Sequence, residues 1–310
     1  MHFVYARHLP LTTLSPFMII SELLIYPIKS LGGISVPEVV VEPKGFRYDR
    51  RFMLVSPDGK FMTQRDHHQM ALIDVAINHD TLRVWHRNRP DAILDLPLVL
   101  PVNSPTVNET LLINIWDSND VPSLTVSAEA DQWFTHAIGT PCRLVFMPET
   151  THRAVDTAYA KANDAVSFAD GYPYLLIGQA SLDELNRRLA APITMLRFRP
   201  NIVVSGSEPN GEDAWEQFRI GELDFYGVKP CARCVLTTID PETGQPGKEP
   251  LRTLTTYRKW NHKILFGQNV LARLTGQNTL GTLRVGQLIE VVSRQEPWLS
   301  PPIPISPLNS

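Results

Sequence analysis

A chain of 310 residues, of which 43% are hydrophobic, is long enough for one large domain or two ordinary ones and can bury a substantial core. Its 29 Lys and Arg residues against 32 Asp and Glu residues give a net charge of -3, which argues against a broad basic face for nucleic acid or for an anionic membrane. Three cysteines cannot form the dense disulfide framework of a small secreted protein, so we expect a reducing, cytoplasmic environment.

The two ends of the chain are expected to lie outside the fold. Residues 1–17 lack the ordered regions of a signal peptide and are interpreted as an extension that need not be native. No apolar run approaches the 18 residues of a membrane span, so no membrane attachment is expected. Residues 295–310 are rich in proline, which favours an extended or disordered tail.

Short strand-like segments dominate the first third of the chain. The first of them ends near Pro27 and delivers Lys29 and Ser30 to a loop. The second and third flank a Ser-Pro-Asp-Gly-Lys turn sequence, which predicts a β-hairpin. This part is therefore predicted to be β-rich and largely antiparallel. The segments are 22–28, 51–55, 61–64, 72–77 and 82–85.

Two helices are predicted further along the chain. One begins after Ser127, which is a good N-cap, and ends at Gly139. The other begins at a capping box formed by Ser181 and Glu184 and ends before Pro192. In the second helix Leu182, Leu185 and Leu189 lie on one face.

Further strands alternate irregularly with these helices. Many short strands and few helices, without regular βαβ alternation, favour a β-rich α+β or barrel architecture. The change from a β-rich front to a mixed back part predicts a boundary near residues 125–150. We therefore expect two domains, over 18–135 and 136–294. The additional strands are predicted over 174–178, 201–206 and 223–226.

The sequence Cys231-Ala232-Arg233-Cys234 holds two of the three cysteines and lies between a predicted strand and a turn. A thiolate can bind a soft metal or attack an electrophile, and a neighbouring guanidinium lowers the cost of deprotonating it. From the spacing alone, a functional role as metal ligand or nucleophile and a structural role as small buried apolar residues are equally good interpretations. Structural zinc is disfavoured because no second pair of ligands has a matching spacing. A thioredoxin-type pair is disfavoured because the β-branched run 235–239 follows instead of a helix.

Several cationic residues stand at the ends of apolar strands, where loops can converge on a ligand. Arginines that bind through two nitrogens, together with a lysine, suit a phosphate-bearing anion. The chain has no glycine-rich loop of the Walker or Rossmann type, so ATP or NAD is not indicated. The residues are Lys29 with Ser30, Arg51, Arg65, Arg199 and Arg233.

The segment 168–173, Phe-Ala-Asp-Gly-Tyr-Pro, precedes the predicted buried strand 174–178. Its Asp-Gly-Tyr-Pro residues are first of all turn formers. The carboxylate of Asp170 at the mouth of a cationic pocket would also be able to relay protons.

These segments together resemble the MOSC-domain proteins of the YcbX and amidoxime-reducing-component type. The resemblance extends from Ser21 to about Val292. It implies a β-barrel-like N-terminal MOSC domain packed against a MOSC β-barrel domain with a few helices. The segments are Tyr26-Pro27-Ile28-Lys29-Ser30, Arg51-Phe52, Thr63-Gln64-Arg65, 168–173, Phe198-Arg199-Pro200-Asn201-Ile202, Cys231 to Cys234 with 237–241, and Phe266-Gly267-Gln268.

The resemblance also implies a molybdenum cofactor, Mo-molybdopterin, in the cleft between the domains. Cys234 would be the protein thiolate on molybdenum, and the pterin dithiolene would supply two more sulfurs. Asp170 would be an acid near the metal and a candidate proton donor. The residues implied to contact the cofactor are Lys29, Ser30, Arg51, Gly171, Tyr172, Arg199, Asn201, Ala232 and Arg233.

The function implied is reduction of N-hydroxylated compounds such as amidoximes, hydroxylamines or N-hydroxylated bases. Animal members have Thr-Ser in place of Gly171-Tyr172, so contacts there are expected through the backbone. The tail lacks the cysteines of the ferredoxin domain found in some bacterial relatives, so a flavin reductase, a ferredoxin or a cytochrome b5-like protein would supply electrons. The alternative function is a non-catalytic carrier of molybdenum cofactor or sulfur. Pyridoxal phosphate binding is implied at the family level only.

Overall fold

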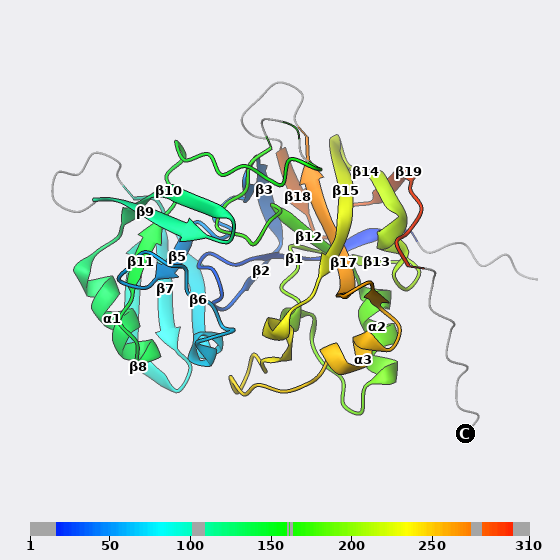
Figure 1. The fold of residues 1–310 in the computed structure, drawn as a ribbon. Helices are drawn as coiled ribbons and strands as arrows, with labels where there is room; N and C mark the ends of the chain where they lie inside the picture. The colour runs from blue at the N-terminus through cyan, green and yellow to red at the C-terminus, as the bar shows by residue number, and fades with distance from the viewer. Residues whose placement is uncertain (1–16, 101–108, 160, 162–163, 274–280, 300–310) are drawn as a thin grey trace, which may run out of the picture.

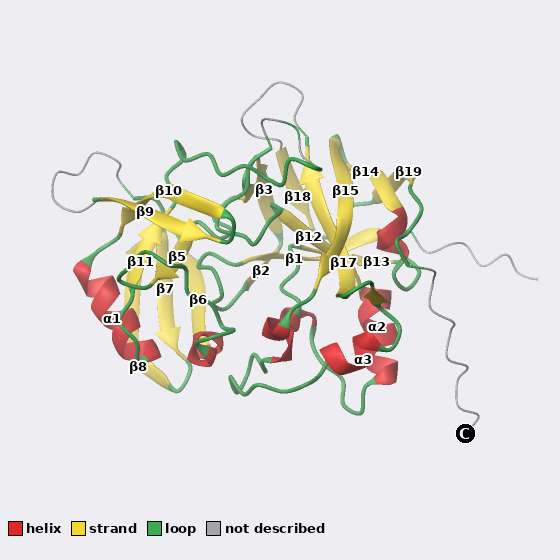
Figure 2. Ribbon diagram, viewed as in Figure 1, coloured by secondary structure: helices red, strands yellow, loops and turns green. Residues whose placement is uncertain are grey.

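The structure is a computed structural model and describes residues 17–100, 109–159, 161, 164–273 and 281–299. In these residues β-sheets form two halves that lie side by side, with helices at the periphery (Figures 1 and 2). The predicted β-rich α+β fold is confirmed. Most of the predicted extension over 1–17 and of the predicted tail over 295–310 lies outside the described residues.

The first half consists mainly of two small antiparallel sheets. In one, the strand order is β5-β11-β10-β9, and in the other it is β6-β7-β8. Their inner faces and one helix enclose a single apolar cluster that includes Phe52, Leu82 and Phe134. The strands are β5 (Phe52–Val55), β6 (Ile73–Asn78), β7 (Thr81–His86), β8 (Arg89–Pro97), β9 (Thr110–Ile115), β10 (Ser118–Thr125) and β11 (Arg143–Phe146).

Helix α1 (Ala128–Ile138) covers this first half, and both of its predicted ends are confirmed. The Ser127 side chain accepts a hydrogen bond from the Ala130 N–H, as an N-cap does. Gly139 ends the helix with φ 76°, a left-handed conformation that glycine adopts without a Cβ clash. Phe134 and Ile138 are buried on the inner face of the helix.

The second half is built on a nine-stranded sheet whose main order is β19-β14-β15-β17-β12-β13-β1-β2, with β16 paired to β17. Strands β1 and β2 of this sheet come from the N-terminal part of the chain, so the sheet combines segments from both ends of the sequence. The strands are β1 (Ile19–Ile25), β2 (Ile34–Val36), β12 (Tyr174–Gly178), β13 (Ile202–Ser205), β14 (Trp215–Ile220), β15 (Leu223–Ala232), β16 (Lys259–Trp260), β17 (Lys263–Ala272) and β19 (Ile289–Arg294).

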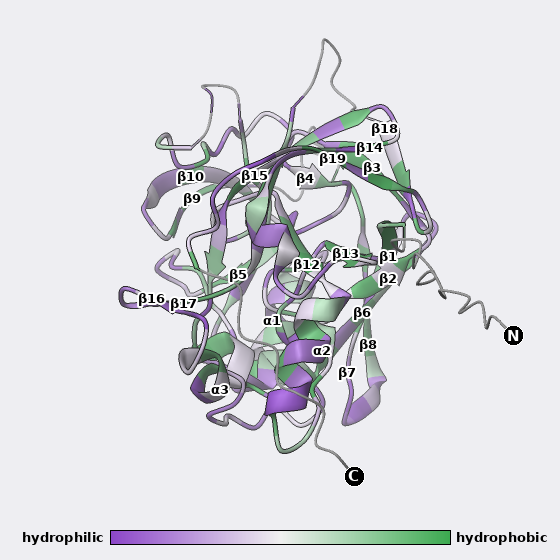
Figure 3. Cartoon of the chain, turned by 90° about the vertical axis from the view of Figure 1, so that its right-hand side faces the viewer, coloured by the Kyte–Doolittle hydropathy of each residue, from purple (hydrophilic) through white to green (hydrophobic). Residues whose placement is uncertain are grey.

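A small sheet also joins the two halves, because β18 pairs with β3 and β3 with β4. The large sheet packs an aromatic core that includes Trp215, Phe218 and Phe225. Figure 3 shows apolar strands inside and polar helix surfaces outside. None of the helices in the described ranges is long and apolar enough to span a membrane. The three strands are β3 (Glu38–Glu42), β4 (Gly45–Phe46) and β18 (Gly281–Arg284).

The second predicted helix exists, but its start was placed wrongly. Helix α2 (Gln179–Arg188) begins after Gly178, and Ser181 lies inside it. The buried Ser181 hydroxyl donates to the Glu212 carboxylate instead of capping the helix. Glu184 pairs with two arginines that follow it in α2, so it is not part of a capping box. Helix α2 connects β12 to the parallel strand β13 and forms a βαβ unit.

Two further expectations change in detail. The predicted hairpin around residues 56–60 has its turn, but the second arm makes only a single bridge between Val55 and Phe61, and β5 pairs mainly with β11. The β-branched run after the cysteines forms a short 3-10 helix, η4 (Val235–Thr238), where strand-like backbone was expected. The remaining helical segments are η1 (His68–Leu72), η2 (Met195–Arg197), η3 (Gly211–Ala214) and α3 (Leu251–Thr255).

Candidate functional site

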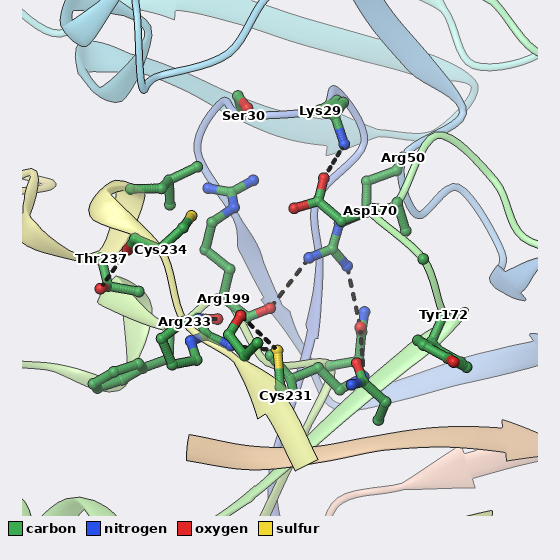
Figure 4. A pocket seen from close by; sticks show the side chains of 18 residues that line it. Lys29, Ser30, Arg50, Asp170, Tyr172, Arg199, Cys231, Arg233, Cys234 and Thr237 are labelled. Carbon is green, nitrogen blue, oxygen red and sulfur yellow. Dashed lines mark hydrogen bonds and ion pairs between the residues drawn. The ribbon is translucent and has the colours of Figure 1, made fainter. Parts of the chain in front are cut away.

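A cleft lies where loops of the two halves meet, and its volume is about 730 Å³ including the part open to solvent. Figure 4 shows side chains from both halves pointing into it. Four of its lining residues are cations and one is an acid. The lining residues are Lys29, Ser30, Arg50, Ala169, Asp170, Gly171, Tyr172, Leu175, Phe198, Arg199, Asn201, Cys231, Ala232, Arg233, Cys234, Leu236, Thr237 and Asn269.

All of the residues that the resemblance assigned to the cofactor or to catalysis, except Arg51, line this cleft, and Arg65 of the predicted cation group is not among its lining residues. The Arg51 side chain is buried elsewhere, where it forms ion pairs with Glu42 at 2.7 Å and Glu149 at 3.1 Å. Its neighbour Arg50 takes the position in the cleft, because the left-handed backbone at Arg50, with φ 49°, directs its side chain away from that of Arg51. The structure therefore brings together ten residues that are far apart in the sequence, and it adds Arg50 to them.

Cys231 lies near the end of β15, and Cys234 directly precedes η4. Cys234 is exposed, and its Sγ accepts a hydrogen bond from Arg65 Nε at 3.3 Å. Arg233 is bonded to the other thiol, with Nη1 donating to Cys231 Sγ at 3.0 Å. The Arg233 backbone N–H donates to the Ile264 carbonyl at 2.7 Å, which fixes this loop on β17. Each cysteine thus has its own guanidinium, and a different segment supplies each one.

The carboxylate of Asp170 joins the two halves. It is paired with Lys29, with Arg65 Nη2 at 3.1 Å and with Trp116 Nε1 at 3.2 Å. Desolvation alone would raise the pKa of this carboxyl, but the Lys29 and Arg65 charges outweigh it and hold the pKa well below its usual range. Burial lowers the pKa of Lys29 to about 8, with Asp170 opposing that shift. Asp170 is therefore ionised at neutral pH, and Lys29 is close to giving up its proton.

Arg153 holds the loop that carries Asp170. Its guanidinium donates to the carbonyls of Ser167 at 2.8 Å, Ala169 at 2.6 Å and Asp170 at 2.9 Å. Burial lowers the pKa of Arg153 to about 10, so it still carries its charge at neutral pH. A guanidinium that satisfies three carbonyls fixes the backbone of this loop, and it thereby sets where the Asp170 carboxylate lies.

Two arginines stack on the ring of Tyr26, which directly follows β1. The guanidinium carbons of Arg50 and Arg199 lie 4.4 Å and 4.2 Å from the ring centroid. Arg50 is fixed by the fully buried Asp49 at 2.6 Å and by Asn201 Oδ1 at 3.1 Å. Arg199 uses Nη1 to donate to the Leu31 carbonyl at 2.7 Å, and burial lowers its pKa to about 10. Both arginines are rigid and charged before any ligand binds.

Three residues of the cleft have left-handed backbone conformations that side chains other than glycine rarely adopt. They are Ser30 with φ 64°, Arg50 with φ 49° and Arg199 with φ 56°. Such conformations cost on the order of 1 to 3 kcal/mol each and persist only where the surrounding structure imposes them. At these three positions on the cleft walls, the protein directs the side chains at a cost in stability.

The cleft also holds buried hydrogen-bond donors without partners. Among the described residues, neither Arg199 Nη2 nor Arg233 Nε has an acceptor. No group of three or more His, Cys, Asp or Glu residues in the described ranges could hold a metal ion. A metal here would therefore have to bring most of its own ligands. An anionic cofactor that carries phosphate and its own sulfur donors fits both the unpaired guanidinium groups and the exposed thiol of Cys234.

The sequence analysis missed some residues that shape the site. Arg50 is followed by a second arginine, Arg51, and only the backbone conformation shows which of the two faces the cleft. Trp116 lies at a turn of the first half, and Arg153 lies in an irregular connection, so neither belongs to a recognisable pattern. Arg65 had been noted as a cation of the cluster but was not placed at the cysteine. No local sequence pattern would have found Trp116 or Arg153, because their contacts lie far away in the sequence.

Comparison with known proteins identifies both halves of the chain. Residues 17–141 match the MOSC N-terminal beta barrel domain, and residues 163–290 match the MOSC domain. The chain is 32% identical to "Mitochondrial amidoxime-reducing component 1" of Mus musculus over 287 residues, covering 89% of this chain and 82% of that protein. The corresponding protein of Homo sapiens is 31% identical over 289 residues, with 89% and 83% covered. "Molybdenum cofactor sulfurase" of Oryza sativa subsp. japonica is 30% identical over 277 residues, covering 80% of this chain and 32% of that protein.

Proposed function

Since this chain belongs to the MOSC-domain proteins of the amidoxime-reducing-component type, we propose that it is a molybdenum-cofactor-dependent reductase of N-hydroxylated compounds. The proposed substrates are amidoximes, hydroxylamines and N-hydroxylated bases, and a separate protein supplies the electrons. The observation that carries this proposal is the accessible Cys234 thiol at the edge of a cleft with unpaired, buried guanidinium nitrogens. This donor set suits an anion that brings its own soft metal.

In this proposal Cys234 is the protein ligand of molybdenum, and the cations hold the anionic part of the cofactor. Arg50 replaces the predicted Arg51, because Arg51 is engaged with two glutamates outside the cleft. Gly171 contributes through its backbone, since it has no side chain. The other proposed cofactor contacts are Lys29, Ser30, Tyr172, Arg199, Asn201, Ala232 and Arg233.

When bound, the cofactor supplies two-electron oxygen-atom chemistry, which converts N–OH to N–H. The balanced reaction takes two electrons and two protons and releases water. The chain itself binds and orients the reactants. Arg65 donates to Cys234 Sγ, which orients the thiolate and offsets its charge. Arg65 also reaches Asp170, so the acid and the proposed metal ligand are positioned by the same side chain.

The charges in the cleft favour Lys29 over Asp170 as the proton donor of the proposed reaction. Asp170 is held as a carboxylate by Lys29 and Arg65, so it accepts hydrogen bonds and has no proton to give at neutral pH. We therefore propose that Asp170 is a positioning residue and not the proton donor suggested by the resemblance. Lys29 Nζ, whose pKa is about 8, is poised to donate a proton near neutral pH and to regain it from solvent.

The experiment combines molybdenum quantification with turnover. Protein from cofactor-replete cells should contain molybdenum in near-stoichiometric amount and reduce many equivalents of an amidoxime when an artificial reductant is supplied. Cys234→Ala should lower turnover by more than about a hundredfold, since loss of outer-shell partners alone costs 10 to 100-fold. Cys231→Ala is the matched control and should keep most activity. Full turnover in the Cys234→Ala protein would exclude the ligand role.

A non-catalytic carrier of molybdenum cofactor or sulfur is the second candidate. It is favoured by the likeness to the protein named molybdenum cofactor sulfurase and by the exposure of Cys234. A carrier needs the same cleft, but it delivers one equivalent and stops. Single-equivalent transfer to an apo-enzyme, without sustained reduction of an N-hydroxylated compound, would support the carrier.

We also propose the domain division 18–135 and 136–294, which limited proteolysis near residues 125–150 tests.

A further inference from the structure

A group of exposed cations lies on α3 and on the β16–β17 hairpin of the second half. Figure 3 shows the end of this hairpin in the hydrophilic colour, projecting from the body of the protein. Arg252 on α3 has 71% of its side chain exposed. We call this surface the basic hairpin face, and its residues are Lys248, Arg252, Lys259, His262 and Lys263, all of them exposed.

The charge of the basic hairpin face is largely uncompensated. Lys248, Lys259 and Lys263 form no ion pair with any residue that the structure describes, whereas Arg252 is paired with Glu249 at 2.6 Å. Acids also lie around the face: the exposed Glu296 comes two residues before Trp298, whose ring packs on Trp260, and Asp240 and Glu242 lie in the turn that leads to Lys248. Three of the four full cations nevertheless have no ion-pair partner among the described residues, on a chain whose net charge is -3. A local positive surface on an acidic protein attracts a negatively charged partner.

The strand pairing places this face beside the proposed metal ligand. Arg233 donates its N–H to Ile264 on one edge of β17, and Lys259 pairs with Ile264 on the other edge. Two neighbouring strands are about 4.8 Å apart, so the backbones of Arg233 and Lys259 are separated by about 10 Å. Helix α3 in turn contacts η4, the short helix that begins directly after Cys234.

Two exposed apolar residues lie on η2 and η4, near the cysteine pair. Val235 is 55% exposed and directly follows Cys234 in the chain. Leu196 is 44% exposed on η2, and η2 contacts η4. Exposed single apolar residues are common, but here Val235 adjoins the proposed metal ligand in the chain, and Leu196 lies on the segment that contacts η4. Small interfaces with a short apolar contact and surrounding charge are typical of transient electron-transfer complexes.

We propose that an acidic one-electron carrier protein docks on the basic hairpin face, with its redox group against Val235 and Leu196. This inference rests on the proposed reductase function and adds the route by which electrons enter. Two reduced carriers each give one electron through the Cys234 side of the cleft and leave oxidised. With two protons, the N–OH group is reduced to N–H and water is released.

The test compares two reductants. A plant-type [2Fe–2S] ferredoxin serves as the acidic carrier, and reduced methyl viologen, a small cation, serves as a donor that needs no docking. The variant Lys259→Glu/Lys263→Glu should lower kcat/KM for ferredoxin about tenfold at low ionic strength, with a flatter salt dependence. Its methyl viologen rate and molybdenum content should match the wild type, which also shows that the variant is folded.

The matched control carries the same change of net charge outside the face. Lys60→Glu/Lys161→Glu alters two exposed lysines in the β5 turn and in the connection from β11 to β12, and it should lose less than about twofold. Equal losses in both variants, or no ferredoxin-driven turnover in a wild type that methyl viologen reduces, would overturn the docking face. Absence of turnover with methyl viologen in the wild type would instead overturn the reductase function.

Discussion

Two clusters of charged residues in this protein contain similar side chains, but one has an excess of cations and the other has an excess of acids. The cleft cluster consists of Lys29, Arg50 and Arg199 with the acids Asp49 and Asp170. The acid cluster lies where η3 meets α2 and the start of β17, and it consists of Glu212, Asp213 and Arg258, each at most 3% exposed. The first has more cations than acids, and the second has more acids than cations.

The acid cluster removes its own excess charge. Glu212 accepts hydrogen bonds from the Gly178 N–H at 3.0 Å and from Ser181 Oγ at 2.8 Å. Burial, assisted by the neighbouring Asp213, raises the pKa of Glu212 to about 7. Arg258 Nη2 neutralises Asp213 at 2.6 Å. A proton on Glu212 and one ion pair therefore leave this cluster close to neutral without any ligand.

The cleft cluster cannot do the same, because a guanidinium does not lose its proton in a protein at neutral pH. Arg199 retains an unpaired Nη2 despite its burial, and its pKa of about 10 leaves it charged. At neutral pH Lys29, whose pKa is about 8, still carries most of its charge, so an anion from outside is needed to balance the excess. A surplus of buried arginine thus marks a ligand site, whereas a surplus of buried carboxylate can be a purely structural feature.

The largest loss of stability is expected from a substitution in the acid cluster. Arg258→Ala leaves the buried Asp213 without its partner and also removes the bond from Arg258 Nε to the Leu265 carbonyl at 2.9 Å. The free energy of unfolding should fall by about 3 to 5 kcal/mol, as for other broken buried pairs. Urea unfolding monitored by tryptophan fluorescence measures it. A loss below about 1 kcal/mol would mean that the pair adds nothing beyond surface ion pairs.

In the cleft the matching change should affect turnover and leave stability nearly unchanged. Asp170→Asn removes the carboxylate that holds Lys29 and Arg65, although the side chain, 58% exposed, loses little packing. We expect turnover to fall about 10 to 100-fold while molybdenum stays bound. Because Asp170 raises the pKa of Lys29, the pH at which activity declines should move down from about 8. An unchanged rate and pH profile would remove Asp170 from the mechanism.

Features of the fold and of the site could be predicted from the sequence where the interacting residues are close together in the chain. Helix α1 was predicted at both ends, because Ser127 and Gly139 act on backbone groups within four residues. Strand β12 was predicted at both ends from its apolar run alone. The cysteine pair and the cations were found because they lie at strand ends, where side chains converge.

The remaining features depend on partners that are distant in the sequence. Ser181 follows the pattern of an N-cap, yet Glu212, 31 residues away, takes its hydroxyl into the acid cluster. The sequence offered no means to choose between Arg50 and Arg51, because the choice follows from the left-handed backbone at Arg50. Arg153 acts on three carbonyls 14 to 17 residues away, which no local pattern reveals.

The smallest expected effect tests whether the acid cluster is indeed neutralised by a proton. The pKa of Glu212 is raised in the folded protein from 4.5 to about 7, so its contribution to stability is complete below about 4.5 and is lost as the pH rises through about 7. Glu212→Gln keeps an oxygen for the Gly178 N–H but cannot ionise. Urea unfolding at several pH values should give similar stabilities at pH 4.5, and the variant should become the more stable protein by pH 8. A constant difference across this range would show that Glu212 is ionised throughout, and the contrast between the two clusters would then rest on Arg258 alone.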